Sequence, residues 1–175
     1  MEYSLYDLIA NSEIDLDEVL LLRHSLSNEN FAKCYNKGKF EEYQKLQYTE
    51  NGEDYFMNKR YILSFVSMRK ELRLPGPYSE FVGCYENRGI SDDPSLFDPE
   101  GFPFPNWYEM IGNGKQHFYD LRLTDIFSDL RNKMIVDYTG YRSIRQKNPE
   151  VFKTKKIVLF PEYLQDKYFD KLKVE

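Results

Sequence analysis

The side chains that could carry metal or acid–base chemistry are few and widely spaced in this chain. The set closest to a metal-dependent nuclease is Asp137, Glu150 and Lys153, because such enzymes hold metal ions with carboxylates and steady the developing charge with a lysine. The spacing of Glu150 and Lys153 is Glu-x-x-Lys, which on a strand would point the two side chains to opposite faces. We therefore expect no nuclease centre from these residues.

Histidine and cysteine are too few and too dispersed to suggest a site. The chain has two histidines, including His24, and two cysteines, Cys34 and Cys84, whereas a zinc site needs three or four such ligands together. His24 could serve as a general base, but no nucleophile or orienting carboxylate accompanies it in the sequence. Phosphate-binding glycine loops and the nucleophile elbow are also missing. We predict no catalytic residue, no metal and no cofactor.

Aromatic, amide and arginine side chains gather in two segments. One segment lies in a helix predicted over 39–47, and the other follows a strand predicted over 133–138. They contain Tyr43, Gln44 and Gln47 in the first, and Tyr138, Tyr141, Arg142 and Gln146 in the second. Amides can pair with base edges, arginine with phosphate or guanine, and tyrosine rings can stack on a base. The alternative is that Tyr43 is a core residue and the glutamines are ordinary exposed helix residues.

The charge is unevenly distributed along the chain. The net charge of −5 and the pI near 5.2 do not indicate a nucleic-acid-binding protein by themselves. Residues 1–30 hold seven acidic residues and one basic, whereas residues 142–156 hold six basic residues and one glutamate. A protein that is acidic in total can still present one basic face. The alternative is an ordinary solvated loop.

The elements that must position these residues form one domain over 1–175, with a core over about 18–160 and helical extensions at both ends. A length of 175 residues, 41% hydrophobic, with 15 Tyr and 13 Phe, is typical of a folded domain and not of a disordered chain. Strands are predicted at 19–24, 61–68, 80–87, 117–123, 133–138 and 155–160. Because no helix separates each pair of strands, we predict an α+β fold with a curved, mainly antiparallel sheet or barrel of about six strands and flanking helices.

Within this sheet, apolar residues are expected to face the core or lie under the helices. The predicted core residues are Phe65, Val82, Leu121, Ile135 and Ile157. A helix capped near Ser27 is expected to end at Gly38, just before the helix over 39–47. The longest apolar stretches fall far short of the roughly 20 residues that cross a bilayer, and no leader opens the chain. We expect a cytoplasmic protein without a membrane partner.

Four segments, taken in order, resemble the N-terminal region found ahead of GIY-YIG nuclease domains in bacterial proteins. They are VLLLRHS at 19–25, FEEYQKLQ at 40–47, YILSFVSMRK…FVGCYENRG at 61–89 and FYDLRL…LRNKMIVDYTGYRSIRQK at 118–147. The SF…FVGxY pair is also similar to PUA-like barrels, including families that read modified bases. The positions that match are Arg23, His24, Tyr43, Gln44, Gln47, Phe81, Gly83, Tyr85, Arg131, Asp137 and Gln146.

The chain departs from this family in two ways. Tyr138 stands where the family usually has Trp, and no GIY followed by YIG is present. The resemblance therefore implies targeting and supplies no catalytic centre. Whether the protein is an enzyme depends on a nuclease domain that would follow this region in a longer chain.

The resemblance implies a nucleic-acid recognition module of a nuclease or restriction-type protein, not catalytic in itself. DNA is favoured over RNA, and a modified base is one option. A PUA-like barrel would hold a flipped base between the sheet and the helices after the first strand, with Arg142, Arg145, Lys147 and Lys153 near phosphates. The two segments described above, which contain Gln44 and Tyr138, should then face one shared, partly polar pocket. The expected binding residues are Arg23, His24, Tyr43, Gln44, Gln47, Tyr85, Tyr138, Tyr141, Arg142, Arg145, Gln146 and Lys147. The alternatives are a protein-interaction or structural domain without nucleic-acid binding, and an enzyme acting on a small molecule.

Overall fold

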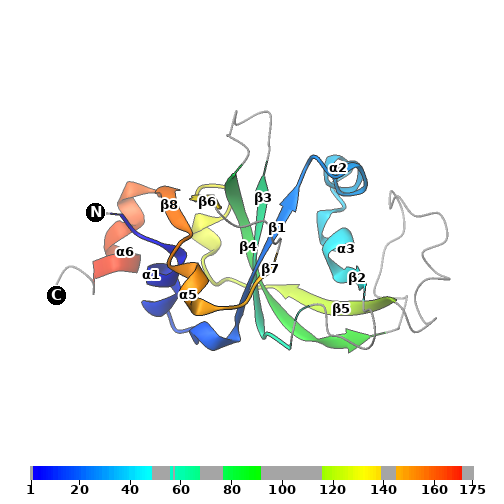
Figure 1. Ribbon diagram of the computed structural model, residues 1–175, viewed down its shortest axis with the longest axis horizontal. Helices are drawn as coiled ribbons and strands as arrows, with labels where there is room; N and C mark the ends of the chain where they lie inside the picture. The colour runs from blue at the N-terminus through cyan, green and yellow to red at the C-terminus, as the bar shows by residue number, and fades with distance from the viewer. Residues whose placement is uncertain are drawn as a thin grey trace.

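The computed structural model describes residues 2–48, 56, 58–67, 77–91, 116–138 and 145–170. Within these residues, eight strands form one sheet, and six of them follow a single path in the order β2-β5-β4-β3-β1-β7. Strand β6 pairs with β4 and with β8 off this path. The strands are β1 Val19–Ser25, β2 Leu46–Tyr48, β3 Tyr61–Ser67, β4 Tyr78–Ser91, β5 Gln116–Leu123, β6 Ile135–Asp137, β7 Arg145–Gln146 and β8 Lys156–Leu159. The sheet is curled into a half-barrel (Figure 1).

The prediction of an α+β fold with a curved, mainly antiparallel sheet is confirmed. Strand β1 runs parallel to β3, and the other described pairs are antiparallel. The long strand β4 joins the β6–β8 part of the sheet to the β5–β2 part. Its first residues pair with β6, and its last residues pair with β5. All six predicted strand regions belong to this one sheet, although the last two form only the short strands β6 and β8.

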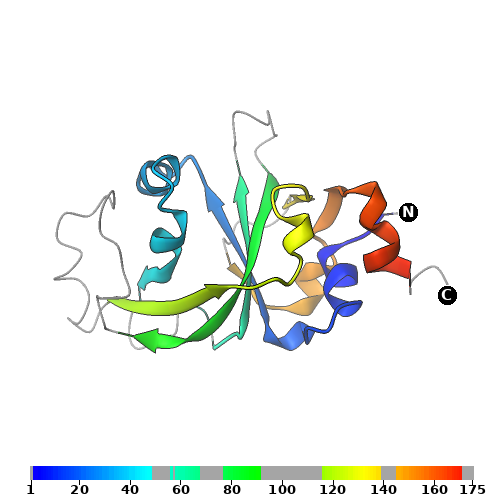
Figure 2. The ribbon, with the colours of Figure 1, turned by 180° about the vertical axis from the view of Figure 1, so that it is seen from behind.

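Helices cover both faces of the sheet. Figures 1 and 2 show α2 and α3 on one side of it, and α1, α5 and α6 on the other. The helical elements are α1 Leu5–Ala10, η1 Leu16–Glu18, α2 Glu29–Asn36, α3 Phe40–Lys45, η4 Ser128–Leu130, α5 Pro149–Phe152, η5 Glu162–Leu164 and α6 Gln165–Phe169. Each face of the sheet therefore has its own packed layer.

Alternation along the strands assigns the apolar side chains to these two layers. On β1, Leu21 packs with Phe65 and Phe81 on the α1 side, whereas Leu22 packs with Ile62 and Tyr85 on the α3 side. In a third group, Phe31 of α2 packs with Val66 of β3 and Val82 of β4. Because neighbouring residues on a strand point to opposite faces, both layers draw on the same strands.

Two of the five predicted core residues are only half-buried. Phe65, Val82 and Leu121 are buried as predicted, but Ile135 and Ile157 are partly exposed. In the three-residue strand β6, Ile135 shares the half-buried face with Asp137. The core-facing positions are taken by Val136 and the flanking Met134 and Tyr138.

The predicted helix over 39–47 is also shorter than expected. It ends at Lys45, and Gln47 lies in β2, where it pairs with His117 of β5. Backbone pairing with β5 therefore replaces the last helical turn, so Gln44 and Gln47 do not share a helix side. The cap of α2 is Asn28, whose side chain accepts from the Phe31 amide at 3.0 Å, while the hydroxyls of Ser25 and Ser27 bond to each other.

Candidate functional site

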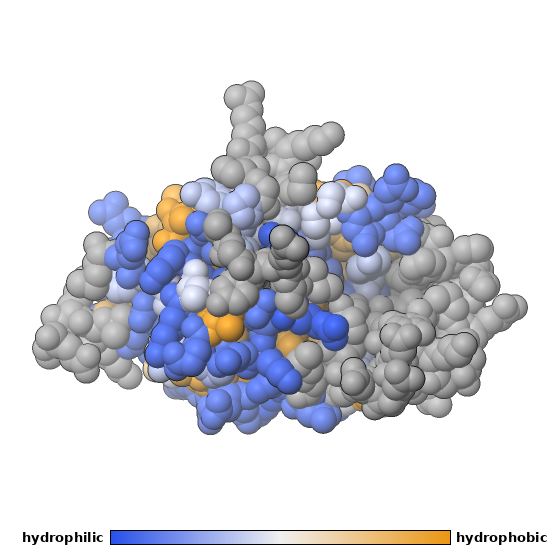
Figure 3. Space-filling view, viewed as in Figure 1, coloured by the Kyte–Doolittle hydropathy of each residue, from blue (hydrophilic) through white to orange (hydrophobic). Residues whose placement is uncertain are grey.

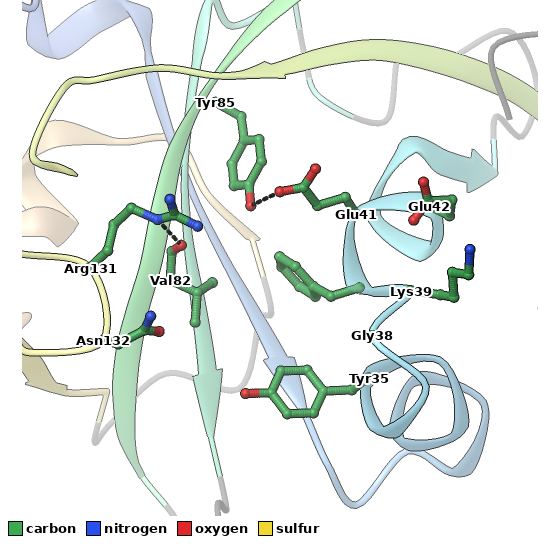
Figure 4. A pocket seen from close by; sticks show the side chains of 10 residues that line it. Tyr35, Gly38, Lys39, Glu41, Glu42, Val82, Tyr85, Arg131 and Asn132 are labelled. Carbon is green, nitrogen blue, oxygen red and sulfur yellow. Dashed lines mark hydrogen bonds between the residues drawn. The ribbon is translucent and has the colours of Figure 1, made fainter. Parts of the chain in front are cut away.

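A pocket of about 570 Å³ lies between the α2–α3 pair and strand β4. Its walls are formed by aromatic side chains and by charged groups of both signs, principally Tyr35, Phe40, Glu41, Val82, Tyr85 and Arg131 (Figure 4). This is the place that the sequence resemblance implied, between the sheet and the helices after the first strand. Of the expected binding residues, Tyr85 lines it.

The turn between α2 and α3 places Tyr35 and Phe40 at the pocket. Gly38 has a φ of +74°, its amide donates to Tyr35 O at 3.0 Å, and the Lys39 amide donates to Cys34 O at 2.8 Å. This pair of bonds closes a helix with a left-handed residue, a conformation that favours glycine. The chain then enters α3 at once, so Glu41 of α3 and Tyr35 of α2 face the same space.

Helix α3 is fixed to the sheet by a buried amide. Gln44 is 1% exposed, and its Oε1 accepts a hydrogen bond from Ser64 Oγ of β3 at 2.6 Å. The same oxygen lies 3.3 Å from His24 Nε2, so His24 donates from that nitrogen. Burial lowers the pKa of His24 to about 4, which keeps the ring neutral at pH 7.

His24, Tyr43 and Gln44 are thus brought together, but beneath the pocket. The His24 ring stacks on Phe31 with centroids 4.8 Å apart and meets Tyr43 edge-on at 6.0 Å. These side chains hold α2 and α3 against β1 and β3. Gln44 does not line the pocket, and its described hydrogen bonds are those of a positioning residue.

One wall of the pocket joins Tyr85, Glu41 and Arg131 (Figure 4). The Tyr85 hydroxyl donates to Glu41 Oε1 at 3.4 Å, and Arg131 Nε donates to Val82 O at 3.0 Å. Burial, and then the nearby Glu41 carboxylate, raise the pKa of Tyr85 well above its usual range. The hydroxyl therefore stays protonated and acts as a donor at neutral pH.

Gly83 allows this wall to form. A Cβ at this position would lie 2.9 Å from Leu123 Cδ1, 3.2 Å from Tyr85 Cε2 and 3.5 Å from Arg131 Nε. A side chain here would crowd the Tyr85 ring and the approach of Arg131 to β4. Gly83, Tyr85 and Arg131 all belong to the motifs that carried the family resemblance.

The lining of the pocket is balanced in charge. Lys39 and Arg131 contribute two positive groups, and Glu41 and Glu42 contribute two negative groups. Such a lining has no net attraction for an anion. It offers hydrogen-bond donors and acceptors on opposite walls, together with aromatic surface.

The expected site residue Tyr138 lies on the other face of the sheet. Its ring contacts Phe65 at 5.4 Å, and it has Lys155 Nζ at 4.6 Å and Arg23 Cζ at 5.6 Å from its centroid. Burial, and then the charge of Arg23, lower the pKa of Lys155 to about 8. This cluster is cationic and belongs to the layer under α1 and α5.

The prediction that Gln44 and Tyr138 face one shared pocket is therefore wrong. Arg23 and His24 are consecutive on β1, so their side chains point to opposite faces. His24 carries Gln44 and α3 on one face, and Arg23 carries Tyr138 on the other. Tyr141 and Arg142, which completed the predicted set, lie outside the described residues.

The other expected residues lie at or near the β7 edge of the sheet. Arg145 pairs with Leu22 and Gln146 with Leu21. Paired residues share a face, so Arg145 is on the α3 side and the buried Gln146 is on the α1 side. Lys147 is exposed after β7, and Lys153 bonds to Glu150 at 3.1 Å.

The sequence did not single out Tyr35, Phe40 and Glu41 as binding residues. Tyr35 and Phe40 fit an ordinary apolar helix face, and Glu41 lies among several acidic residues. Arg131 was marked by the resemblance alone. Residues 35 and 131 are far apart in the chain, and their approach depends on the pairing of β4 with β3, which no local pattern indicates.

Among the described residues, no group of three or more His, Cys, Asp or Glu side chains is placed to bind a metal ion. Nor does that part of the chain contain a helix with the length and apolar character to span a membrane.

Comparison of the chain with protein-family models, with curated proteins and with solved structures finds no match.

Proposed function

We propose that the chain binds nucleic acid, DNA in preference to RNA, by taking one unstacked base into the pocket between α2–α3 and β4. The observation that carries this proposal is the combination of Tyr35, Phe40 and Tyr85 with Arg131 and Glu41 around about 570 Å³. Ligand pockets in proteins span about 300–1,000 Å³ and combine aromatic walls with a few polar groups. A flipped base needs the same combination of stacking and edge contacts.

The balanced charge of the lining suits a base and does not suit a phosphate. Phosphates bind to arginine and lysine, and this makes affinity depend on salt. Lys39 lines the pocket and Lys37 is exposed beside it, and we expect these two lysines to contact the backbone on either side of an inserted base. We therefore assign base reading to the pocket and phosphate contacts to the lysines at its mouth.

The setting of this activity follows from the family resemblance. In a nuclease or restriction-type protein, this domain would select the target and another domain would cut it. A modified base remains one of the ligands to test, since similarity to PUA-like barrels includes readers of modified bases.

The second candidate function, a protein-interaction domain, has one observation in its favour. Val158, Leu159 and Tyr163 are 45%, 55% and 72% exposed around β8 and η5. The described residues on the face in Figure 3 are nevertheless mostly hydrophilic, with apolar residues in small separate patches. Interaction sites are usually larger continuous apolar patches, so we place this function second.

The test of the proposed function is oligonucleotide binding by fluorescence anisotropy. Single-stranded DNA, duplex DNA and single-stranded RNA are titrated at about 50 and 200 mM salt, where phosphate contacts differ strongly in strength. Loss of one stacking ring costs about 1–3 kcal/mol, so Tyr35→Ala should weaken binding about 5- to 150-fold. Tyr35→Phe keeps the ring and should stay close to wild type.

Tyr163→Ala is the matched control, because it removes an exposed tyrosine from η5, outside the pocket. Equal effects of Tyr35→Ala and Tyr163→Ala would place binding elsewhere. Absence of binding to every oligonucleotide at the lower salt concentration would refute the proposed function and leave the protein-interaction domain as the alternative.

A further inference from the structure

We infer that the pocket prefers guanine among the four standard bases, an inference that rests on the proposed function. Its basis is the placement of a guanidinium and a carboxylate around one pocket, with the Tyr85 hydroxyl at the carboxylate. Figure 4 shows Arg131 reaching toward the pocket from the β4 side and Glu41 from the α3 side. The two side chains come from segments 90 residues apart in the chain.

The orientation of Arg131 is set by the backbone of β4. Its Nε donates to Val82 O at 3.0 Å, and Gly83 leaves space for this approach. This bond uses only the Nε–H of the guanidinium group, so the two Nη groups are the donors that can bind a ligand. A guanidinium held in this way presents a planar pair of donors, which binds two neighbouring acceptors.

Glu41 presents the complementary pair of acceptors. Its Oε1 accepts the Tyr85 hydroxyl at 3.4 Å, a long hydrogen bond. Among the described residues, Oε2 has no hydrogen-bond partner. A ligand with two neighbouring N–H donors would use both oxygens and leave the Tyr85 hydroxyl close enough to steady the carboxylate.

Guanine is the standard base that matches both groups at once. Its N7 and O6 are neighbouring acceptors, and its N1–H and N2–H₂ are neighbouring donors on another side of the ring. Adenine and thymine have no two neighbouring acceptors, so each would set a donor against Arg131. Cytosine offers the neighbouring acceptors N3 and O2 but only its 4-amino group as a donor for Glu41. None of these three bases satisfies both groups. The half-buried rings of Tyr35 and Phe40 stack with any base and therefore add affinity without selecting among bases. Tyr85 is only 2% exposed and contributes its hydroxyl group to the wall.

The test uses labelled single-stranded DNA of nine residues, thymine at every position except the centre. The central base is guanine, adenine, cytosine, thymine, hypoxanthine or 7-deazaguanine. Hypoxanthine lacks the 2-amino donor facing Glu41, and 7-deazaguanine lacks the N7 acceptor facing Arg131. A good bidentate pair discriminates between bases by about 5- to 150-fold, and we expect guanine to bind more tightly than the other standard bases by this margin.

Two variants assign the contacts to atoms. Glu41→Gln should abolish the advantage of guanine over hypoxanthine, while Glu29→Gln, which removes the same charge from an exposed position of α2, should preserve it. Arg131→Lys should abolish the advantage of guanine over 7-deazaguanine, while Arg122→Lys on the exposed side of β5 should preserve it. Both variants keep similar size, and a normal thermal melt shows that each is folded.

The outcomes separate this inference from the proposed function. If all six oligonucleotides bind equally and Tyr35→Ala still weakens them all, the pocket takes a base but the preference for guanine is refuted. If guanine is preferred but neither Glu41→Gln nor Arg131→Lys changes the preference, the assigned contacts are refuted. If no oligonucleotide binds, the proposed function fails and this inference fails with it.

Discussion

The Tyr85 hydroxyl donates a hydrogen bond to Glu41 Oε1 at 3.4 Å, and this contact joins strand β4 to helix α3 at the wall of the pocket. Strands β2 and β3 lie between these two elements along the chain. Their contact shows that the α2–α3 pair is positioned by the sheet and not by its own turn alone. The buried hydrogen bonds of Gln44 to Ser64 and His24 therefore also help to hold α3 against the sheet.

The first prediction concerns the bond between Gln44 and Ser64. A buried polar group that loses its partner costs about 1–3 kcal/mol, so Gln44→Leu should lower the free energy of unfolding by about that amount. Ser64→Ala should lower the free energy of unfolding less. It removes the buried hydroxyl itself, and Gln44 Oε1 keeps His24 as a hydrogen-bond partner. In urea denaturation, the double variant should be more stable than the sum of the single effects, with a coupling of about 0.5–3 kcal/mol. Strict additivity would contradict the role of this bond.

The second prediction is a dependence of stability on pH through His24. Burial lowers its pKa from 6.5 to about 4, so between these values the unfolded chain binds a proton that the folded chain does not. Stability should therefore be complete above pH 6.5 and fall as the pH decreases toward 4, by at most about 1.4 kcal/mol per pH unit. His24→Phe should be less stable at pH 7 but should show a smaller fall.

Urea denaturation of wild type and His24→Phe at pH 7, 6, 5 and 4 tests this prediction. The carboxylates titrate in both proteins, so the difference between the two slopes isolates His24. Equal slopes between pH 6.5 and 4 would show that the ring is accessible to protons in the folded state.

The third prediction separates crowding from backbone conformation in β4. Gly83→Ala places a methyl group 2.9 Å from Leu123 Cδ1 and 3.2 Å from Tyr85 Cε2, and overpacking of this kind costs about 1–3 kcal/mol. Gly89→Ala is the control. Both glycines have a positive φ, +156° at Gly83 and +124° at Gly89, but nothing lies within 4 Å of a Cβ added at Gly89. Thermal melts should show the larger loss for Gly83→Ala, with partial recovery on adding Leu123→Ala. Equal losses would exclude crowding as the cause.

The fourth prediction concerns Lys155 on the opposite face of the sheet. Burial and the charge of Arg23 lower its pKa from 10.5 to about 8. Between pH 8 and 10.5 the unfolded chain keeps a proton that the folded chain has lost, so this residue makes stability rise with pH through that window. Lys155→Met should remove the rise, as measured by denaturation at pH 7, 8, 9 and 10 against wild type. An unchanged difference between the two proteins across the window would contradict the prediction.

Much of the fold could be predicted because its signals are local. The apolar run that forms β1 and the glycine that ends α2 both act within a few residues, and both are observed where they were expected. Short elements could not be found in this way. Strand β7 has two residues and exists because β1 offers it an edge, while β2 replaces the last turn of a predicted helix because β5 is available to pair with it.

The candidate site was harder to predict because it depends on which face each strand presents. Arg23 and His24 are adjacent in the sequence and were expected to act together, yet they belong to opposite faces of β1. In β6, Ile135 and Val136 are equally apolar, so composition does not decide which of them faces the core. The pocket itself brings residue 35 to residue 131, a proximity that follows from the order of the strands.

The most direct test of the central claim is to locate a bound base by photocrosslinking. A single-stranded DNA with one 6-thioguanine at its centre and thymine at every other position is irradiated at saturating concentration, and the modified peptides are identified by mass spectrometry. If a base enters the pocket between α2–α3 and β4, the crosslinks should map to Tyr35, Phe40 or Tyr85, and Tyr35→Ala should change their distribution. Crosslinks that map instead to β8 or η5, around Tyr163, would contradict the account.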